Sequence, residues 1–198
     1  MTIQIINGDL LEASENILGH QVNCQGVMGS GIAKILRDRY PNLFPEYKKY
    51  CDQYTPDELL GHCQLVQTGA KYTANLFGQL DYGRSKTRYT DYAALEQALT
   101  ILRTEAQAKG LSVALPCNIG CGLANGEWSV VEQMIGRFLQ TMKLLCIKYR
   151  QLYKAHQARL LTSRLALFCA PYTGHLVVMR VADFLLGGVN PVAQLNEE

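Results

Sequence analysis

Two glycine-rich turns in this chain each stand between a strand-like run and a helical run. The first lies in HQVNCQGVMGSGIAKILRDRYP (residues 20–41) and the second in PCNIGCGLANG (residues 116–126). Glycine allows the backbone to approach a ligand closely, and a turn that opens a helix presents a row of N–H donors to an anion. The chemistry that these turns suggest is phosphate binding, although a glycine turn can also be a mere connection. The first turn has neither the lysine of a P-loop nor the G-x-G-x-x-G spacing of a Rossmann turn.

The elements that must position the turns follow from hydrophobic periodicity. Apolar runs predict strands over residues 3–7, 19–23, 63–68, 72–77, 111–115 and 143–149. Helical spacing predicts helices over residues 30–40, 45–54, 91–109 and 127–139, with Ser30 and Thr90 as caps. Ligands of open α/β sheets lie at the carboxyl ends of the strands, so we expect the two turns to close on one phosphorylated ligand from both sides.

Composition limits the class of protein. The chain has 198 residues and is 48% hydrophobic, which suits one well-buried domain with a small appendage. The net charge of +2 gives no support for non-specific binding of nucleic acid. No apolar run approaches the roughly 20 residues of a membrane helix, so no membrane partner is expected.

Cysteine usage indicates a reducing compartment. The seven cysteines are an odd number without a C-x-x-C pair, and no signal peptide precedes them, so we expect reduced thiols and a cytoplasmic protein. The nearest approach to a metal set, His62 and Cys63 with Cys117 and Cys121, does not have the paired spacing of a zinc site. We therefore expect no metal and no cofactor.

Three segments together resemble the ligand-facing segments of a macrodomain: GDLLEA (residues 8–13), HQVNCQGVMGSGIA (20–33) and LPCNIGCGLANGEW (115–128). The following RYPNLFPEYKKYC and LLGHCQLV are similar to the ADP-ribose-1″-phosphate phosphatase branch of that family. The resemblance covers about residues 1–150. It implies an α/β fold, a three-layer α/β/α sandwich with a central mixed six-stranded sheet, which binds ADP-ribose in a cleft.

The resemblance also implies roles for individual residues. Asp9 would accept a hydrogen bond from the adenine amino group beside the amide of Leu10, and Asn23 would face the distal ribose. One side of the diphosphate would be lined by Gly29, Ser30, Gly31 and Ile32, and the other by Gly120, Cys121, Gly122 and Leu123. Asp9 could instead simply cap a turn, and Asn23 could be a satisfied amide at a strand end.

For phosphatase chemistry the resemblance matches His20 to a histidine of that branch, as a group able to move a proton near neutral pH, with Asn23 orienting the substrate. The alternative for His20 is a strand-end histidine bonded to nearby backbone. Branches that remove ADP-ribose from glutamate or DNA use a lysine after the YTANLF-like strand, where this chain has Phe77-Gly78-Gln79. The glutamate-acting branch also has an aspartate where this chain has Ala124.

We therefore expect a phosphatase that converts ADP-ribose-1″-phosphate to ADP-ribose and phosphate. The alternatives are a non-catalytic reader of ADP-ribose and a hydrolase that removes ADP-ribose from modified proteins or nucleic acid, so ADP-ribosylated macromolecules are further candidate partners. Residues 1–150 would form the macrodomain. Residues 151–198 would be a C-terminal extension of helical character and unknown role, because they carry no motif.

Overall fold

The computed structural model describes residues 4–138 and 144–148, and side chains for residues 8–137. These residues lie within the unit Met1–Arg150. The strands are β1 (Gln4–Asn7), β2 (Ile17–Asn23), β3 (Cys63–Thr68), β4 (Lys71–Gln79), β5 (Val113–Pro116) and β6 (Leu144–Lys148). The helices are the 3-10 turn η1 (Leu10–Glu12), α1 (Gly31–Arg39), α2 (Leu43–Cys51), α3 (Pro56–Leu59), α4 (Tyr92–Lys109) and α5 (Trp128–Phe138).

The strands form one mixed sheet in the order β1-β6-β5-β2-β4-β3. Only the β3–β4 pair is antiparallel among the described strands, and the other pairs are parallel. The backbones of β1 and β6 are described, and side-chain packing is described for the four strands β2 to β5. The parallel strands all end at one edge of the sheet, which brings the loops that follow them together.

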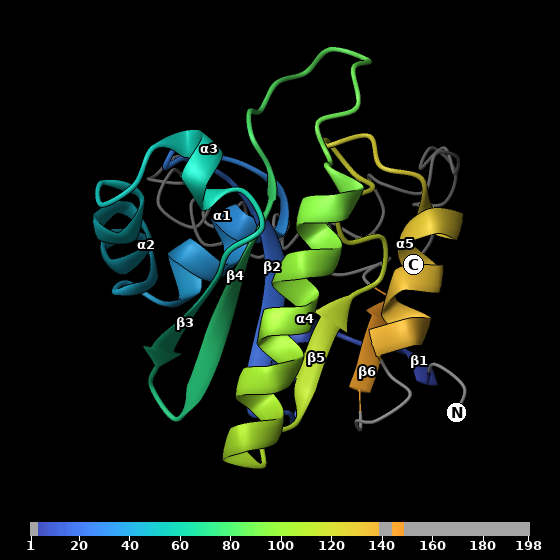
Figure 1. Cartoon of the computed structure of the whole chain (residues 1–198). Coiled ribbons are helices and arrows are strands. Elements are labelled where there is room, and N and C mark those ends of the chain that lie inside the picture. Colours follow the sequence, from blue (N-terminus) through green and yellow to red (C-terminus); the bar gives the residue numbers. More distant parts are fainter. Residues whose placement is uncertain (1–3, 139–143, 149–198) are drawn as a thin grey trace, which may run out of the picture. The chain divides into compact units, whose positions relative to one another are not determined.

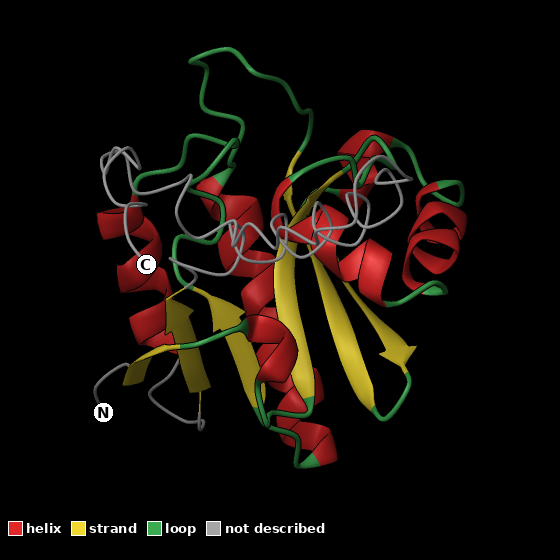
Figure 2. Cartoon of the chain, turned by 180° about the vertical axis from the view of Figure 1, so that it is seen from behind, coloured by secondary structure: helices red, strands yellow, loops and turns green. Residues whose placement is uncertain are grey.

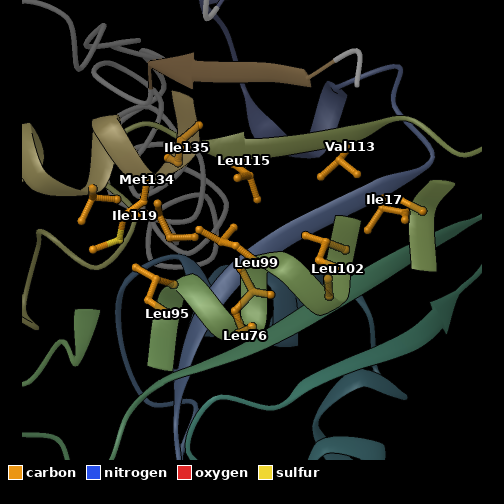
Figure 3. Packing of buried hydrophobic residues seen from close by; sticks show 14 residues of the cluster. Ile17, Leu76, Leu95, Leu99, Leu102, Val113, Leu115, Ile119, Met134 and Ile135 are labelled. Atoms are coloured by element: carbon orange, nitrogen blue, oxygen red, sulfur yellow. The ribbon is translucent and has the colours of Figure 1, made fainter. Parts of the chain in front are cut away.

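Helices cover both faces of the sheet (Figures 1 and 2). α4 and α5 pack on one face over Ile17, Leu76 and Leu115, and Figure 3 shows this cluster from close by. α1 and α2 pack on the other face over Leu18 and Phe77. All seven residues of β2 are buried, because β2 lies inside the sheet between two helical layers.

The predicted α/β fold with a mixed sheet is confirmed, and most element boundaries differ from the prediction by one to three residues. η1 and α3 were not predicted, since each is only one turn long. The predicted cap of α4 was wrong by one position: Asp91, not Thr90, accepts the hydrogen bond of the Ala94 N–H at 2.9 Å. The predicted C-terminal extension, residues 151–198, lies outside the described residues.

Candidate functional site

The candidate site lies at the edge of the sheet where the parallel strands end. The loops that leave this edge are residues 8–9 after β1, 24–30 after β2, 80–91 after β4 and 117–127 after β5. The loop after β4 projects farthest beyond the edge, as the green segment at the top of Figure 1. The two glycine turns of the sequence are the loops after β2 and β5, and these strands are neighbours in the sheet.

Side-chain hydrogen bonds hold the loop after β2 in one shape. Asn23 Oδ1 accepts from two backbone N–H groups of the loop, at 3.0 and 3.2 Å, and Asn23 Nδ2 donates to the carbonyl of Val27 at 2.6 Å. The Tyr47 hydroxyl donates to the Asn23 carbonyl at 2.6 Å, and the Arg37 guanidinium donates to the Met28 carbonyl at 2.9 Å. The loop is therefore fixed before any ligand binds.

Asn23 thus has a structural task in addition to its predicted contact with ribose. The side chain is 7% exposed and is bonded within its own loop. An amide nitrogen carries two N–H groups, and one of them is given to Val27. The second N–H of this amide forms no hydrogen bond with a described residue.

In the first turn of α1, no described residue accepts a hydrogen bond from the N–H groups of Gly31, Ile32 or Ala33. Ser30 is the N-cap of α1, as predicted, but its hydroxyl makes no capping hydrogen bond. Gly29, Ser30 and Gly31 are exposed and Ile32 is half-buried. The first N–H groups of a helix have no acceptor within the helix, and the helix dipole attracts negative charge to that end. This helix start has the form of an anion site.

The loop after β5 consists of two successive turns. The Cys121 N–H donates to the Asn118 carbonyl at 2.9 Å, and the Asn125 N–H donates to the Gly122 carbonyl at 3.0 Å. Asn118 and Asn125 adopt positive φ angles of 61° and 55°, which asparagine tolerates better than most residues.

The second turn leaves further backbone donors without partners. Among the described residues, none accepts a hydrogen bond from the N–H of Gly122, Leu123 or Ala124. Gly122 is exposed and the Leu123 side chain is 55% exposed, which is unusual for a leucine beside a core. The loops after β2 and β5 therefore each offer backbone N–H groups at the same edge of the sheet.

Asp9 begins η1 at the same edge. Its Oδ1 accepts from the N–H of Leu11 at 2.9 Å, so that this carboxylate caps the 3-10 turn, the alternative considered for it above. A carboxylate has a second oxygen, and Asp9 is partly exposed. The neighbouring Leu10 side chain is fully buried, so a ligand at this edge could contact only the backbone of Leu10.

The catalytic role predicted for His20 does not agree with the structure. His20 lies inside β2 with its ring 0% exposed, and its Nε2 lies 2.7 Å from Asn75 Oδ1. Burial lowers the pKa of His20 from 6.5 to about 4, since desolvation disfavours the charged ring. His20 is therefore a neutral core histidine near pH 7, because the strand that carries it is covered on both faces.

The thiol of Cys121 is unsuited to nucleophilic chemistry. Burial raises the pKa of Cys121 to about 11, and the Sγ donates to the Ile119 carbonyl at 3.3 Å. A thiol with such a pKa is protonated near pH 7. The residue therefore contributes backbone to the second turn rather than a reactive side chain.

Sequence reasoning missed the contribution of the loop after β4. Asn125 Nδ2 donates to the carbonyls of Ser85 at 2.9 Å and Thr87 at 2.7 Å, and the N–H of Tyr89 donates to the Ala124 carbonyl at 2.9 Å. The loop after β4 is thereby attached to the loop after β5. It carries the exposed cations Arg84, Lys86 and Arg88. The sequence of this loop has neither helical nor strand periodicity, so its position relative to the loop after β5 could not be predicted.

Neither a metal centre nor a membrane span is found within the part of the chain that the structure describes. Residues 4–138 and 144–148 contain no group of three or more histidine, cysteine, aspartate or glutamate side chains that could hold a metal ion. Over the same ranges no helix is long and apolar enough to cross a membrane.

Comparison with known proteins places these features in a family. The family model of the Macro domain matches residues 20–135. The chain is 30% identical over 164 residues to a protein named ADP-ribose 1″-phosphate phosphatase from Scheffersomyces stipitis, covering 69% of this chain and 94% of that protein. It is 34% identical over 135 residues to a protein named DNA ADP-ribosyl glycohydrolase from Mycobacterium tuberculosis, covering 65% of this chain but only 36% of that protein.

The fold agrees with the sequence comparison. The macrodomain of Mycobacterium tuberculosis DarG has a TM-score of 0.64 and 28% identity to this chain, and the match covers 75% of this chain and 99% of that structure. Both sets of N–H groups that have no acceptor among the described residues lie within the matched segment, residues 20–135. The chain belongs to the macrodomain family.

Proposed function

We propose that this macrodomain binds ADP-ribose and hydrolyses ADP-ribose-1″-phosphate to ADP-ribose and phosphate. The observation that carries the proposal is the pair of backbone donor sets, at the start of α1 and at Gly122–Ala124, on neighbouring loops of one sheet edge. Similarity to the phosphatase of Scheffersomyces stipitis over 94% of that protein supports the choice of substrate.

In the proposed complex the adenine amino group donates to the free oxygen of Asp9, next to the backbone amide of Leu10. Gly29, Ser30, Gly31 and Ile32 line one side of the diphosphate. Gly120, Cys121, Gly122 and Leu123 line the other side, and Asn23 gives its second N–H to the distal ribose. Each charge-assisted hydrogen bond contributes about 1.5 to 3 kcal/mol, so a few of them support micromolar affinity without a lysine.

The proposed hydrolysis depends on positioning and electrostatics. A water oxygen forms a bond to the phosphorus of the 1″-phosphate, and the bond from phosphorus to the ribose oxygen breaks. Backbone N–H groups stabilise the charge that develops on the phosphoryl oxygens, and such donors act without reorganisation when they are fixed in advance. With His20 buried, the phosphate oxygens and solvent carry the proton from the attacking water to the leaving ribose oxygen.

A second candidate is removal of ADP-ribose from a macromolecule. The similarity to the Mycobacterium tuberculosis glycohydrolase favours it, and so do the three exposed cations of the loop after β4. Two features argue against a lysine-dependent reaction: the end of β4 reads Phe77-Gly78-Gln79 without a lysine, and the position of the aspartate is occupied by the buried Ala124. A reader that only binds ADP-ribose needs the same donor sets, so turnover separates the three functions.

The proposal is tested by placing charge beside the proposed phosphate. A Cβ at the exposed Gly122 would meet no atom of the described residues within 4 Å, so Gly122→Glu and Gly122→Gln are both compatible with the fold. We expect Gly122→Glu to weaken ADP-ribose binding at least about tenfold in calorimetry, because a like charge opposes the diphosphate. The isosteric Gly122→Gln lowers affinity much less.

Phosphate release is measured on the same proteins with ADP-ribose-1″-phosphate, and ADP-ribose release with modified DNA and peptide. Gln67→Glu, exposed on β3 away from the carboxyl edge of β2 and β5, is the control for added charge. Equal binding by Gly122→Glu and Gly122→Gln contradicts the diphosphate position. Binding without phosphate release contradicts the phosphatase and leaves the hydrolase of macromolecules or the reader, which release of ADP-ribose then distinguishes.

A further inference from the structure

A buried amide supports the loop after β5 from below. Gln21 belongs to β2, and its side chain is buried. Its Nε2 donates to Gln79 Oε1 at 2.9 Å and to Thr90 Oγ1 at 3.0 Å. Among the described residues no group donates to Gln21 Oε1, so the two Nε2 bonds alone hold this buried amide in place. Gln21 thereby connects β2 to Thr90, near the end of the loop after β4.

Thr90 continues the connection to the second turn. Its side chain is buried, 1% exposed, and its Oγ1 donates to the Gly120 carbonyl at 2.6 Å. The Gly126 N–H donates to the same carbonyl at 2.9 Å, and the Thr90 N–H donates to the Ala124 carbonyl at 3.1 Å. The two ends and the middle of the Gly120–Gly126 segment are therefore held by hydrogen bonds that involve Thr90 or share its acceptor.

Two glycines of the second turn are required by this packing. Gly120 has a φ of +71°, and a Cβ there would stand 2.5 Å from Gln21 Oε1 and 3.0 Å from Thr90 Oγ1. A Cβ on Gly126 would stand 2.6 Å from the Gly120 carbonyl oxygen. Real Cβ atoms do not come so close to other atoms. Both positions therefore require glycine because a side chain would collide with neighbouring atoms of the protein.

We infer that Gln21 and Thr90 are positioning residues for the loop after β5. Together they fix the Gly120 carbonyl, from which the chain continues into the unpaired N–H groups of Gly122, Leu123 and Ala124. The inference rests on the proposed function, in which these N–H groups bind the diphosphate. Gln21 and Thr90 are buried and act through the loop rather than by touching the ligand.

The test compares a side chain that keeps the hydroxyl with one that lacks it. Thr90→Val has nearly the same shape as threonine but cannot donate to Gly120, whereas Thr90→Ser keeps the donor. In calorimetry with ADP-ribose, Thr90→Val is expected to bind about tenfold more weakly and Thr90→Ser within about threefold of the original chain. Thr100→Val, at an exposed position of α4 whose hydroxyl bonds Glu96 within the same helix, is the matched control and binds normally.

A second readout needs no ligand. The Gly126 N–H is bonded to the carbonyl that Thr90 holds, so its hydrogen exchange reports the fixation of the loop. Thr90→Val is expected to exchange this proton at least about tenfold faster, while Thr90→Ser and Thr100→Val leave its rate unchanged. A uniform rise of exchange across β2 and α4 would instead reflect lost global stability and would overturn the inference.

The outcomes separate the inference from the function on which it rests. Thr90→Val that binds ADP-ribose normally, or a failure of Thr90→Ser to restore binding, overturns the inference. If the unaltered chain itself does not bind ADP-ribose, the proposed function fails. In that case hydrogen exchange of the Gly126 N–H alone tests the inference. A local increase of this exchange rate in Thr90→Val supports the positioning role of Thr90, and no increase contradicts it.

Discussion

His20 lies inside β2, and its position favours the neutral ring. The Nε2 is paired with Asn75 Oδ1 at 2.7 Å, and Asn75 Nδ2 donates in turn to Gln64 Oε1 at 2.9 Å. Since the amide nitrogen of Asn75 is used toward Gln64, its oxygen faces His20 and accepts the Nε2–H. A proton added at Nδ1 would create a charge without solvent, which is the reason for the lowered pKa.

Stability should therefore depend on the charge of this residue. The folded protein resists protonation of His20 down to a pKa of about 4, whereas the unfolded chain binds the proton near the usual 6.5. Between these values the unfolded state binds more protons, so the free energy of unfolding falls as pH falls from about 6.5, by about 3 kcal/mol in all near pH 4. Urea denaturation of the original chain and His20→Gln across this range measures the effect.

For His20→Gln, the free energy of unfolding is expected to fall less steeply as the pH falls from about 6.5 to 4, because glutamine does not titrate. Ile17→Val lowers stability without changing any titratable group, so its curve should run parallel to that of the original chain. Equal slopes for the original chain and His20→Gln would mean that the ring charges in the folded state.

The residue scale is also where the sequence was least informative. The matched segments predicted that the backbone around Gly29 and Gly122 faces the ligand, and the structure shows that these two loops follow neighbouring strands of one sheet. They did not distinguish a histidine in a cleft from a histidine in the core. That distinction depends on which strand lies inside the sheet, and the seven buried residues of β2 are known only once the strand order is known.

At the scale of elements, the sequence predicted the long helix α4 and the strands around it well. The predicted helix over residues 91–109 is found at Tyr92–Lys109, because its apolar period is sustained and a glycine ends it. The predicted helix over residues 45–54 is shifted to Leu43–Cys51, since Pro45 tolerates the first turn at more than one position. The loop after β4 has no periodicity, and its attachment through Asn125 was not predictable.

The end of α4 gives a prediction for a single element. Gly110 adopts a left-handed φ of 65° and receives no contact at its Cβ position, so a side chain there meets only the backbone penalty. Gly110→Ala should lower the free energy of unfolding by about 1 kcal/mol, measured by urea denaturation. Gly110→Asn should lower it less, because asparagine tolerates this conformation. Equal losses in the two variants would argue against the left-handed cap.

At the scale of the whole described unit, one sheet separates two apolar clusters. The cluster under α4 and α5 includes Leu99 and Ile135, and the cluster under α1 and α2 includes Leu36 and Val66. β2 and β5 contribute buried residues to both clusters. Because the strands between the clusters are shared, loss of packing on one face removes support from the other, and both faces are expected to unfold together.

The only tryptophan of the chain provides a test of this cooperativity. Trp128 packs against the cluster under α4 and α5, so its fluorescence reports that face alone. Val66→Ala, on β3 and in the opposite cluster, should lower the urea midpoint of the Trp128 signal through a loss of about 2 kcal/mol. Ile135→Val, in the cluster against which Trp128 packs, should lower the midpoint through a loss of about 1 kcal/mol. If the two faces unfolded separately, Val66→Ala would leave the Trp128 midpoint unchanged while Ile135→Val still lowered it, and the sheet would not couple the clusters. If they unfold as one, the double variant shows the sum of both losses to within about 0.5 kcal/mol, because the two residues belong to different clusters.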